Sequence, residues 1–350
     1  MYDVPHLRFP EFSGEWERKR LKDVCNIRTG NKNTQDKSDN GIYPFYVRSQ
    51  IVERINSWTF DGEAILTAGD GVGVGKVFHY STGKIGVHQR VYILSDFKCD
   101  GKYLYSYFAG NFYNRVKRMS AKNSVDSVRM EMIADMPIAL PSIEEQKKIG
   151  HLLALLDDRI TTQNKIIEKL QSLIKGLAAQ LTQSGTPNVR LCDCLECHSS
   201  TLQENCVSAT GSYPVYGATG LIGYTNGYAY NGESILIVKD GSGVGSLSYA
   251  NDCYSVIGTL NYLTAKGKYS VLYLYYALMA FNFTPYITGM AIPHIYFKDY
   301  GKAKVFCPSI ENQIRIASLL HNIEQKLVVE QNLIISLSAQ KSYLLRMLFI

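Results

Sequence analysis

Residues 141–149 read PSIEEQKKI, and residues 308–316 read PSIENQIRI. The two stretches stand 167 residues apart and share Pro, Ser, Ile, Glu, Gln and a final Ile at the same places. Proline suits the approach to a first helical turn, and the serine that follows it is a good N-cap. Glu145, Gln146 and Gln313 supply acceptors for the first turn. Each stretch therefore predicts the start of a helix.

Apolar residues follow each opening at alternating spacings of three and four, the heptad pattern of a helix that buries one stripe against a partner helix. Seven of nine stripe positions are apolar in both copies, and polar Gln163 recurs as Glu330. Each helix of roughly 40 residues would be about 60 Å long. The residues predicted to pair the helices are Leu153, Leu156, Ile160, Ile167, Leu170, Leu177, Leu320, Ile323, Leu327, Ile334, Leu337 and Leu344.

The segments before the two openings also repeat, at an offset of 170 residues. DGVGVG at residues 70–75 answers to DGSGVG at 240–245, and YLY at 103–105 answers to YLY at 273–275. The change of offset from 170 to 167 places a three-residue deletion between the tyrosines and the second helix. We therefore expect a domain at 1–141, a helix at 142–184, a second domain at 185–307 and a second helix at 308–350.

Short runs of β-branched and aromatic residues, bounded by Gly, Asp and Asn, predict strands in both domains. Helical spacing predicts helices at Tyr103–Arg118 and Tyr269–Phe281. The expected fold class is α+β, with two repeated mixed domains, mostly of irregular antiparallel sheet. Two long antiparallel coiled-coil helices would separate them with pseudo-twofold symmetry. The expected strands are Ala64–Thr67, Val91–Leu94, Ser234–Val238 and Leu260–Thr264.

The composition is that of a folded protein, with 46% hydrophobic residues among 350 and enough apolar surface for two or more cores. No charged start precedes an apolar signal segment, and the longest apolar run, at 271–281, is too short to span a bilayer. We expect a cytoplasmic protein without membrane contact. Its eight cysteines are then buried or free thiols.

The net charge of +6 is unevenly distributed. Residues 1–141 contain 20 Lys and Arg against 16 Asp and Glu, whereas residues 185–307 contain seven of each. The basic bias of the first domain fits contact with a polyanion. The second domain holds 15 of the 25 tyrosines, which offer phenolic donors and stackable rings.

The glycine-rich loops resemble a phosphate-binding loop only in part. Asp70 stands where a P-loop needs glycine, Val77 where it needs Ser or Thr for magnesium, and Ser246 replaces the lysine in the second copy. A tight turn between two strands, in which glycine takes positive φ, is the better interpretation. The glycines would serve either the close approach of another backbone, such as that of DNA, or the turn alone.

Cys194, Cys197 and His198 have the spacing of a haem-attachment motif, and Cys192 adds a third sulfur that suggests zinc. Haem attachment requires export, for which the sequence has no signal. Two of the three cysteine positions are apolar in the first repeat, so a metal site is the less favoured interpretation. No HExxH or GxSxG motif occurs, no two prolines are adjacent and none precedes Asp, which argues against enzyme activity.

The doubled Pro-x-x-Glu-x-Gln-x-x-Ile pattern resembles the start of the conserved helices in specificity subunits of type I restriction-modification systems. The opening LRFPEF at residues 7–12, followed by Gly14-Glu15-Trp16, is also similar to such subunits. The resemblance covers essentially the whole chain. It implies two target-recognition domains that each read one half of a split, asymmetric double-stranded DNA sequence. It also implies two helices that bind two modification (methyltransferase) subunits.

The resemblance further implies a non-catalytic subunit without its own cofactor or metal. S-adenosylmethionine, ATP and magnesium would serve only the partners, and ATP-driven restriction subunits would join through the modification subunits. Polar residues in loops at one edge of each sheet would contact DNA. The first-domain candidates are Arg28, Lys32, Arg48, Lys76, Arg90, Lys122, Asn123, Ser124 and Arg129. The second-domain candidates are Ser199, Thr219, Tyr224, Lys239, Thr259, His294, Tyr296 and Lys298.

Two other interpretations stay open. The chain could be a specificity subunit that serves an orphan methyltransferase or another phage-defence complex, which differs only in its partners. A protein of a different class, a duplicated coiled-coil assembly scaffold, would use the same domains to bind protein. Salt-dependent, sequence-selective DNA binding separates the scaffold from the other two.

Overall fold

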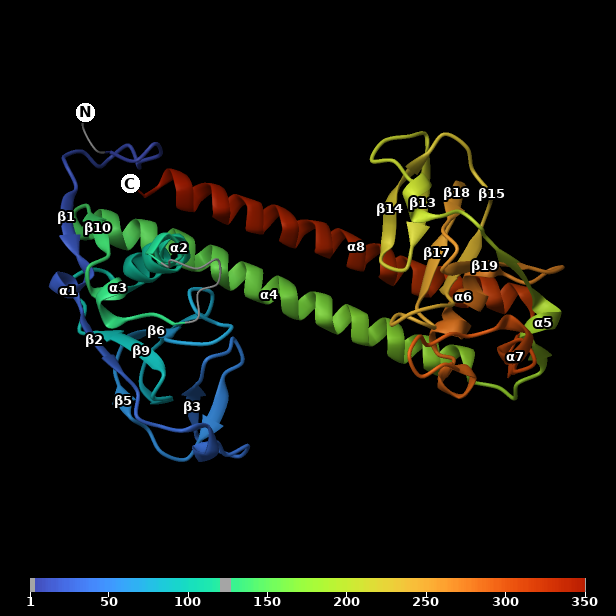
Figure 1. Ribbon diagram of the computed structural model, residues 1–350, viewed down its shortest axis with the longest axis horizontal. Coiled ribbons are helices and arrows are strands. Elements are labelled where there is room, and N and C mark those ends of the chain that lie inside the picture. The colour runs from blue at the N-terminus through green and yellow to red at the C-terminus, as the bar shows by residue number, and fades with distance from the viewer. Residues whose placement is uncertain (1–3, 120–126, 350) are drawn as a thin grey trace. The chain divides into compact units, whose positions relative to one another are not determined.

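The computed structural model describes residues 4–119 and 127–349, and it divides into two units (Figure 1). Unit 1 comprises Met1–Gln163 with Leu333–Ile350, and unit 2 comprises Asn164–Asn332. Both boundaries fall inside long helices, α4 (Ile143–Thr182) and α8 (Ile310–Met347). The long helices predicted after the two Pro-Ser-Ile-Glu openings are therefore present, and each contributes residues to both units.

Unit 1 is built from two four-stranded sheets, a two-stranded ribbon and helices. The central sheet has the order β2 (Asn26–Thr29), β9 (Val91–Ser95), β6 (Ala64–Ala68), β7 (Phe78–Ser81). The outer sheet has the order β4 (Glu53–Ile55), β3 (Tyr43–Tyr46), β8 (Lys84–Val87), β5 (Phe60–Asp61). The ribbon pairs β1 (Glu17–Arg20) with β10 (Pro137–Leu140). The remaining helices are α1 (Leu21–Val24), η1 (Thr34–Asp36), α2 (Gly101–Met119) and α3 (Met130–Ala134).

Strand β6 explains how the layers of unit 1 stack. All five of its residues are buried, and neighbouring side chains of a strand point to opposite faces of the sheet. Ile65 belongs to the core cluster that includes α2 residues, whereas Leu66 belongs to a second cluster with Phe60 of the outer sheet. The continuous apolar run therefore reflects a strand covered on both faces, by helix α2 on one and the outer sheet on the other.

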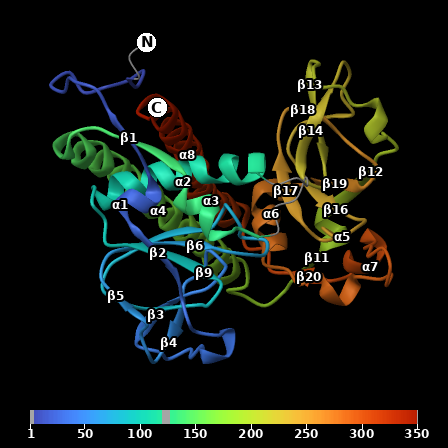
Figure 2. The same ribbon diagram turned by 60° about the vertical axis from the view of Figure 1, so that its left-hand side comes forward.

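Unit 2 repeats this order of strands. Its central sheet is β12 (Leu195–Ser199), β19 (Leu260–Ala265), β16 (Ser234–Val238), β17 (Leu247–Ala250). Its outer sheet is β14 (Gly220–Thr225), β13 (Tyr213–Gly217), β18 (Cys253–Val256), β15 (Tyr230–Asn231), and its ribbon pairs β11 (Val189–Arg190) with β20 (Lys304–Val305). The remaining helices are α5 (Leu191–Cys194), η2 (Glu204–Cys206), α6 (Val271–Met279), η3 (Thr284–Tyr286) and α7 (Phe297–Tyr300). Figure 2 shows β13, β14 and β18 at one end of this unit and α5 and α7 at the other.

The four predicted strands are confirmed as β6, β9, β16 and β19. The predicted antiparallel pairing is confirmed for most strand pairs, although β3 with β8 and β13 with β18 run parallel. Helix α6 is shorter than predicted at both ends. The Ser270 hydroxyl caps it by accepting a hydrogen bond from the Tyr273 amide at 3.2 Å, so Tyr269 lies before the helix.

Gln146 and Gln313 have a different role from the predicted one. The Gln146 side chain donates from Nε2 to the Pro141 carbonyl (2.8 Å), and its Oε1 accepts from the Asp100 amide (3.0 Å). In unit 2, Gln313 donates to the carbonyl of Pro308 (2.9 Å) and accepts from the amide of Ser270 (3.1 Å). The prediction of first-turn acceptors is wrong for both glutamines, because each connects the start of a long helix to the segment that begins α2 or α6.

The segment before Trp16 packs on the start of α4. Glu145, also predicted as a first-turn acceptor, instead receives two hydrogen bonds of 2.8 Å from the Arg8 guanidinium. The Leu7 amide donates to the Met347 carbonyl at the end of α8 (2.8 Å). The Ser142 hydroxyl does accept a hydrogen bond from the Glu145 amide, at 3.3 Å, as a capping serine should.

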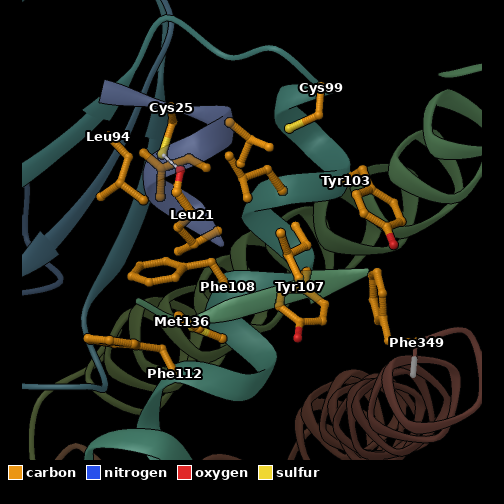
Figure 3. Close-up of a cluster of buried hydrophobic side chains, with 14 of the residues drawn as sticks. Leu21, Cys25, Leu94, Cys99, Tyr103, Tyr107, Phe108, Phe112, Met136 and Phe349 are labelled. Atoms are coloured by element: carbon orange, nitrogen blue, oxygen red, sulfur yellow. Dashed lines mark hydrogen bonds between the residues drawn. The ribbon is translucent and has the colours of Figure 1, made fainter. Parts of the chain in front are cut away.

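Within unit 1, α8 ends inside the core of the sheet domain. Phe349 packs against Tyr103 and Tyr107, with ring centroids 5.2 and 5.5 Å apart (Figure 3). Earlier in α8, Lys341 donates a hydrogen bond to Asp157 of α4. Further along the chain, Leu348 shares the core cluster with Ile149 and Leu153 of α4. Residues later in α8 therefore meet residues earlier in α4, so the two helix halves of this unit are antiparallel.

All predicted helix-pairing residues are buried or half-buried. In unit 1 these include Leu153 and Leu337, which are almost fully buried. In unit 2, Ile174 and Ala178 of α4 share a core with Leu320 of α8. Helices α4 and α8 are thus packed together through the stripe that repeats in the sequence.

The glycine loops join β6 to β7 and β16 to β17 as tight turns, as predicted. Gly71 and Gly75 have φ of +79° and +66°, and Gly241 and Gly245 have φ of +95° and +85°. These values lie in the left-handed region that favours glycine. A Cβ atom on Gly75 would also stand only 3.0 Å from the Tyr113 ring.

Replacing either glutamine bridge should destabilise its unit. Gln146→Ala leaves a buried carbonyl and a half-buried amide without their side-chain partner, so we expect a loss of about 2–4 kcal/mol in the free energy of unfolding. Gln313→Ala should have the same effect in unit 2. Urea denaturation measures both, with Gln171→Ala, an exposed position on α4, as the control. Equal stability of all three variants would contradict the bridging role.

Two glycine substitutions should shift stability in opposite directions. Gly75→Ala forces a left-handed conformation that costs a non-glycine residue about 1–2 kcal/mol, and its Cβ also crowds Tyr113. Gly176→Ala on α4 meets no atom within 4 Å, so it should gain about 0.5–1 kcal/mol from helix propensity. Thermal unfolding should show a lower midpoint for the first variant and a higher one for the second. A higher midpoint for Gly75→Ala would show that the turn does not need glycine.

Candidate nucleic-acid interface

The residue that precedes the glycine turn makes the same two backbone hydrogen bonds in both units, and we call this arrangement the backbone frame. In unit 1 the Gly69 amide donates to the Arg90 carbonyl (2.8 Å), and the Val128 amide donates to the Gly69 carbonyl (2.7 Å). In unit 2 the Lys239 amide donates to the Thr259 carbonyl (3.0 Å), and the Ile295 amide donates to the Lys239 carbonyl (2.9 Å). Each turn is thereby held beside two other loops.

We call these surroundings the loop edge of each unit. The loop edge of unit 1 comprises residues 30–32, 48–49, 69–76, 88–90 and 127–129, and that of unit 2 comprises residues 199–202, 218–219, 239–246, 257–259 and 294–298. Isolated β-bridges join Asp70 to Ser127 and Asp240 to His294, at matching positions of the repeat. Segments distant in sequence therefore meet at one edge of each central sheet.

Two predicted arginines converge on one carboxylate at the loop edge of unit 1. Arg48 donates to Asp70 Oδ1 at 2.7 Å, and Arg90 donates to Asp70 Oδ2. Asp70 is only 20% exposed, whereas Arg48 is 43% exposed and Arg90 is 60% exposed. The carboxylate thus lies behind two guanidinium groups that face solvent.

The electrostatics of this cluster follow from its geometry. Burial by itself raises the pKa of Asp70, but the hydrogen bonds from Arg90 and Arg48 outweigh burial and hold the pKa below its usual value. Burial lowers the pKa of the neighbouring His88, and the charge of Arg48 lowers it further. The lowered pKa favours the neutral imidazole of His88. Its Nδ1 accepts from the Arg90 amide (3.1 Å), which leaves Nε2 as the donor to Thr34 (3.3 Å).

The other described candidates of unit 1 lie at or next to this loop edge. Lys76 ends the glycine turn, with its ammonium 5.6 Å from the centre of the Tyr113 ring. The backbone of Lys32 forms an isolated β-bridge with that of His88, and exposed Arg129 precedes α3. Arg28 lies slightly further along β2, with its guanidinium over Phe60. The predicted candidates Lys122, Asn123 and Ser124 lie outside the described residues.

The loop edge of unit 2 has the same frame but different side chains. Lys239 donates to Asp240, and the His294 and Tyr296 rings lie 5.1 Å apart. The Lys298 ammonium lies 5.1 Å from the Tyr296 ring. Three further predicted residues belong to this edge, namely Ser199, Thr219 and Thr259. Tyr224 does not, because it pairs with Pro214 at the opposite end of β13.

Part of the tyrosine enrichment in unit 2 serves the core and not a surface. Tyr254, Tyr273, Tyr276 and Tyr300 are at most 1% exposed. The Tyr273 hydroxyl donates to the Phe306 carbonyl (2.7 Å), as Tyr103 donates to Ala139 in unit 1 (2.6 Å). The expectation that these phenols are available to a ligand is therefore wrong for the buried ones.

Asp70 and Asp240 are loop-edge residues that the candidates predicted from the sequence did not include. A sequence signal for them exists, because aspartate opens the glycine turn in both repeats. No group of three or more potential metal ligands occurs among residues 4–119 and 127–349. Within the same ranges, no helix is long and apolar enough to cross a bilayer.

Comparison with known proteins identifies the family. Residues 13–172 and 188–339 each match the family described as "Type I restriction modification DNA specificity domain". The specificity subunit of the Escherichia coli type I restriction enzyme EcoDI is 28% identical over 161 residues, which are 46% of this chain and 35% of that subunit. A specificity subunit of Methanocaldococcus jannaschii is 28% identical over 193 residues, 51% of this chain and 44% of that one. The chain thus matches less than half the length of either relative.

A solved structure supports the fold independently. The S subunit of a type I restriction-modification system from Mycoplasma genitalium has a TM-score of 0.77 at 17% identity, and the match covers 99% of both chains. The duplicated sheet domains, each followed by a long helix, are therefore a known architecture. Two matched segments, which together span most of the sequence, show that the chain belongs to the type I restriction-modification DNA specificity family.

Proposed function

We propose that the chain is the DNA-recognition subunit of a type I restriction-modification complex, in which each loop edge reads one part of a bipartite, asymmetric target. One observation carries the proposal: the two loop edges share a backbone frame, yet their side chains differ. Arg90 and Arg129 of unit 1 correspond to Thr259 and Tyr296 of unit 2. A constant frame with variable polar side chains is what two different base sequences require.

The chemistry of the two edges suits DNA. Lysine and arginine neutralise phosphates, and arginine donates two hydrogen bonds to the O6 and N7 atoms of guanine. The edge of unit 1 presents Arg48, Lys76 and Arg90, whereas that of unit 2 presents two lysines, Lys239 and Lys298, beside neutral donors and a Tyr-His pair. We therefore expect unit 1 to supply more of the salt-dependent affinity.

The helices supply the surface for partner subunits in this proposal. Large apolar side chains are exposed on both helices, and contiguous exposed apolar surface marks interaction sites. We propose that two modification subunits cover this surface, and that restriction subunits join through them. S-adenosylmethionine, ATP and magnesium then serve the partners, and the complex acts on DNA in the cytoplasm. The exposed residues are Ile143, Leu155, Ile166, Leu173, Ile314, Leu319, Val328, Val329, Ile335 and Tyr343.

The functional division proposed for the chain follows the repeat. Residues 1–141 and 185–307 are target-recognition domains, and residues 142–184 and 308–350 are helices that set the distance between the two recognised sequences. The candidate DNA-binding residues at or next to the two loop edges keep their proposed roles in this division, whereas Tyr224 lies away from the edge.

The decisive experiment measures DNA binding by the chain assembled with its modification subunits. Methylation mapping in the source cell identifies the target, and fluorescence anisotropy then compares target and scrambled duplexes over a range of salt concentrations. We expect tight, selective binding that weakens steeply as salt rises, because phosphate contacts release counterions. Equal, weak binding to both duplexes would favour the assembly-scaffold interpretation.

Replacing Arg129 or its counterpart Tyr296 by alanine should affect recognition of different halves of the target. Arg129→Ala should weaken binding by about 1–3 kcal/mol when it removes a base contact, and selectivity should relax in one half-site only. Tyr296→Ala should relax the other half-site. Binding to duplexes with single substitutions measures both effects, with Lys98→Ala, an exposed cation beyond the opposite end of β9, as the control. Intact selectivity in both variants would exclude these residues as base readers.

Lengthening both helices should change only the unread spacer of the target. Inserting one heptad after Leu170 and another after Leu337 keeps the apolar stripe in register. Methylation mapping should then show both half-sites unchanged and a longer spacer between them. A changed half-site with an unchanged spacer would contradict the proposed division between domains and helices.

A further inference from the structure

The cluster of Arg48, Asp70 and Arg90 poses a question that DNA contact alone does not answer. A surface designed only to bind phosphate has no use for a carboxylate between its cations, because the carboxylate offsets their charge. Asp70 nevertheless accepts a hydrogen bond on each oxygen, one from each guanidinium. The matching residue of unit 2 is Asp240, which accepts a hydrogen bond from Lys239. Each loop edge therefore has an acid beside a cation.

Burial distinguishes this cluster from an ordinary surface ion pair. Asp70 is less exposed than either arginine, and the bridge to Ser127 fixes its backbone. The carboxylate is therefore the fixed member, and the two longer side chains are oriented by it. An arginine has five N–H donors in a planar fork. Each guanidinium keeps donors free for a further acceptor after one hydrogen bond to Asp70.

We propose that Asp70 is a positioning residue that determines specificity, and this inference rests on the proposed function. Asp70 orients Arg48 and Arg90 for the acceptors of the correct bases. At any other sequence the arginines reach phosphates only by leaving Asp70, so contact with incorrect DNA competes with an existing ion pair. The acid thereby lowers affinity for non-target DNA more than affinity for the target.

Unit 2 should show a weaker form of the same effect. Asp240 occupies the matching position but accepts from a single cation, the adjacent Lys239, and Arg48 and Arg90 correspond to Ala218 and Thr259. Asp240→Asn should therefore release one cation, whereas Asp70→Asn releases two.

The test compares Asp70→Asn with Asp135→Asn in the chain assembled with its modification subunits. Asp135 is a matched control, because it also accepts from two cations, Arg20 (3.0 Å) and Lys22 (2.8 Å), but belongs to the turn that ends α3. Both variants lose one negative charge. Anisotropy titrations over a range of salt concentrations measure the affinity for target duplex, for duplexes altered in one half-site and for scrambled duplex.

We expect Asp70→Asn to bind scrambled DNA more tightly, with a salt dependence steeper by about one to two phosphate contacts. Discrimination at one half-site should fall about tenfold or more, with the other half-site unaffected. Asp135→Asn should match the wild type in all three measurements. A merely structural Asp70 would instead weaken binding to every duplex alike, and that result would overturn the proposal, as would identical behaviour of the two variants.

A second measurement keeps the proposal falsifiable should Asp70→Asn fail to fold. Phenylglyoxal modifies arginine side chains, and mass spectrometry of the unsubstituted complex without DNA gives a rate for each. Arg48 and Arg90 should react more slowly than Arg54, an exposed arginine on β4. Equal rates for the three would overturn the proposal. A wild-type complex that does not distinguish target from scrambled DNA would instead reject the proposed function itself.

Discussion

The hydrogen bonds of one buried glutamine in each unit are the contacts on which the architecture depends. Gln146 and Gln313 each connect the carbonyl that precedes a long helix to the amide that begins α2 or α6. These backbone groups lie where neither a helix nor a sheet supplies a partner, and a buried backbone group without a partner is costly. The glutamine therefore fixes where each long helix leaves its sheet domain.

Much of the fold could be predicted from the sequence because the signals were periodic or repeated. The stripe of α4 and α8, the buried strands and the glycine turns each follow from a local pattern that the second copy confirms. The role of Gln146 could not be predicted, because its partners lie on a segment that only the folded chain brings near. Helix α6 begins two residues later than predicted for a local reason, the Ser270 N-cap, which periodicity does not detect.

The candidate site was predictable to a lesser degree. Arg48 and Arg90 were recognisable as polar loop residues, but nothing in their spacing indicates that both bind Asp70. Convergence of three loops is a property of the tertiary structure. Tyrosine enrichment in unit 2 gave the opposite error, since Tyr273 and Tyr300 are amphipathic residues whose rings fill the core. Composition does not distinguish a buried phenol from an exposed one.

The burial of Phe349 against Tyr103 and Tyr107 has a consequence for biosynthesis. Unit 1 combines the first part of the chain, Met1–Gln163, with its last part, Leu333–Ile350. Roughly 200 residues are translated between its β10 strand and the last turn of α8. At about 5–20 residues per second, the ribosome needs on the order of 10–40 s for that stretch. The first sheet domain must therefore persist with an open aromatic face while unit 2 emerges, and it completes its core only when α8 arrives.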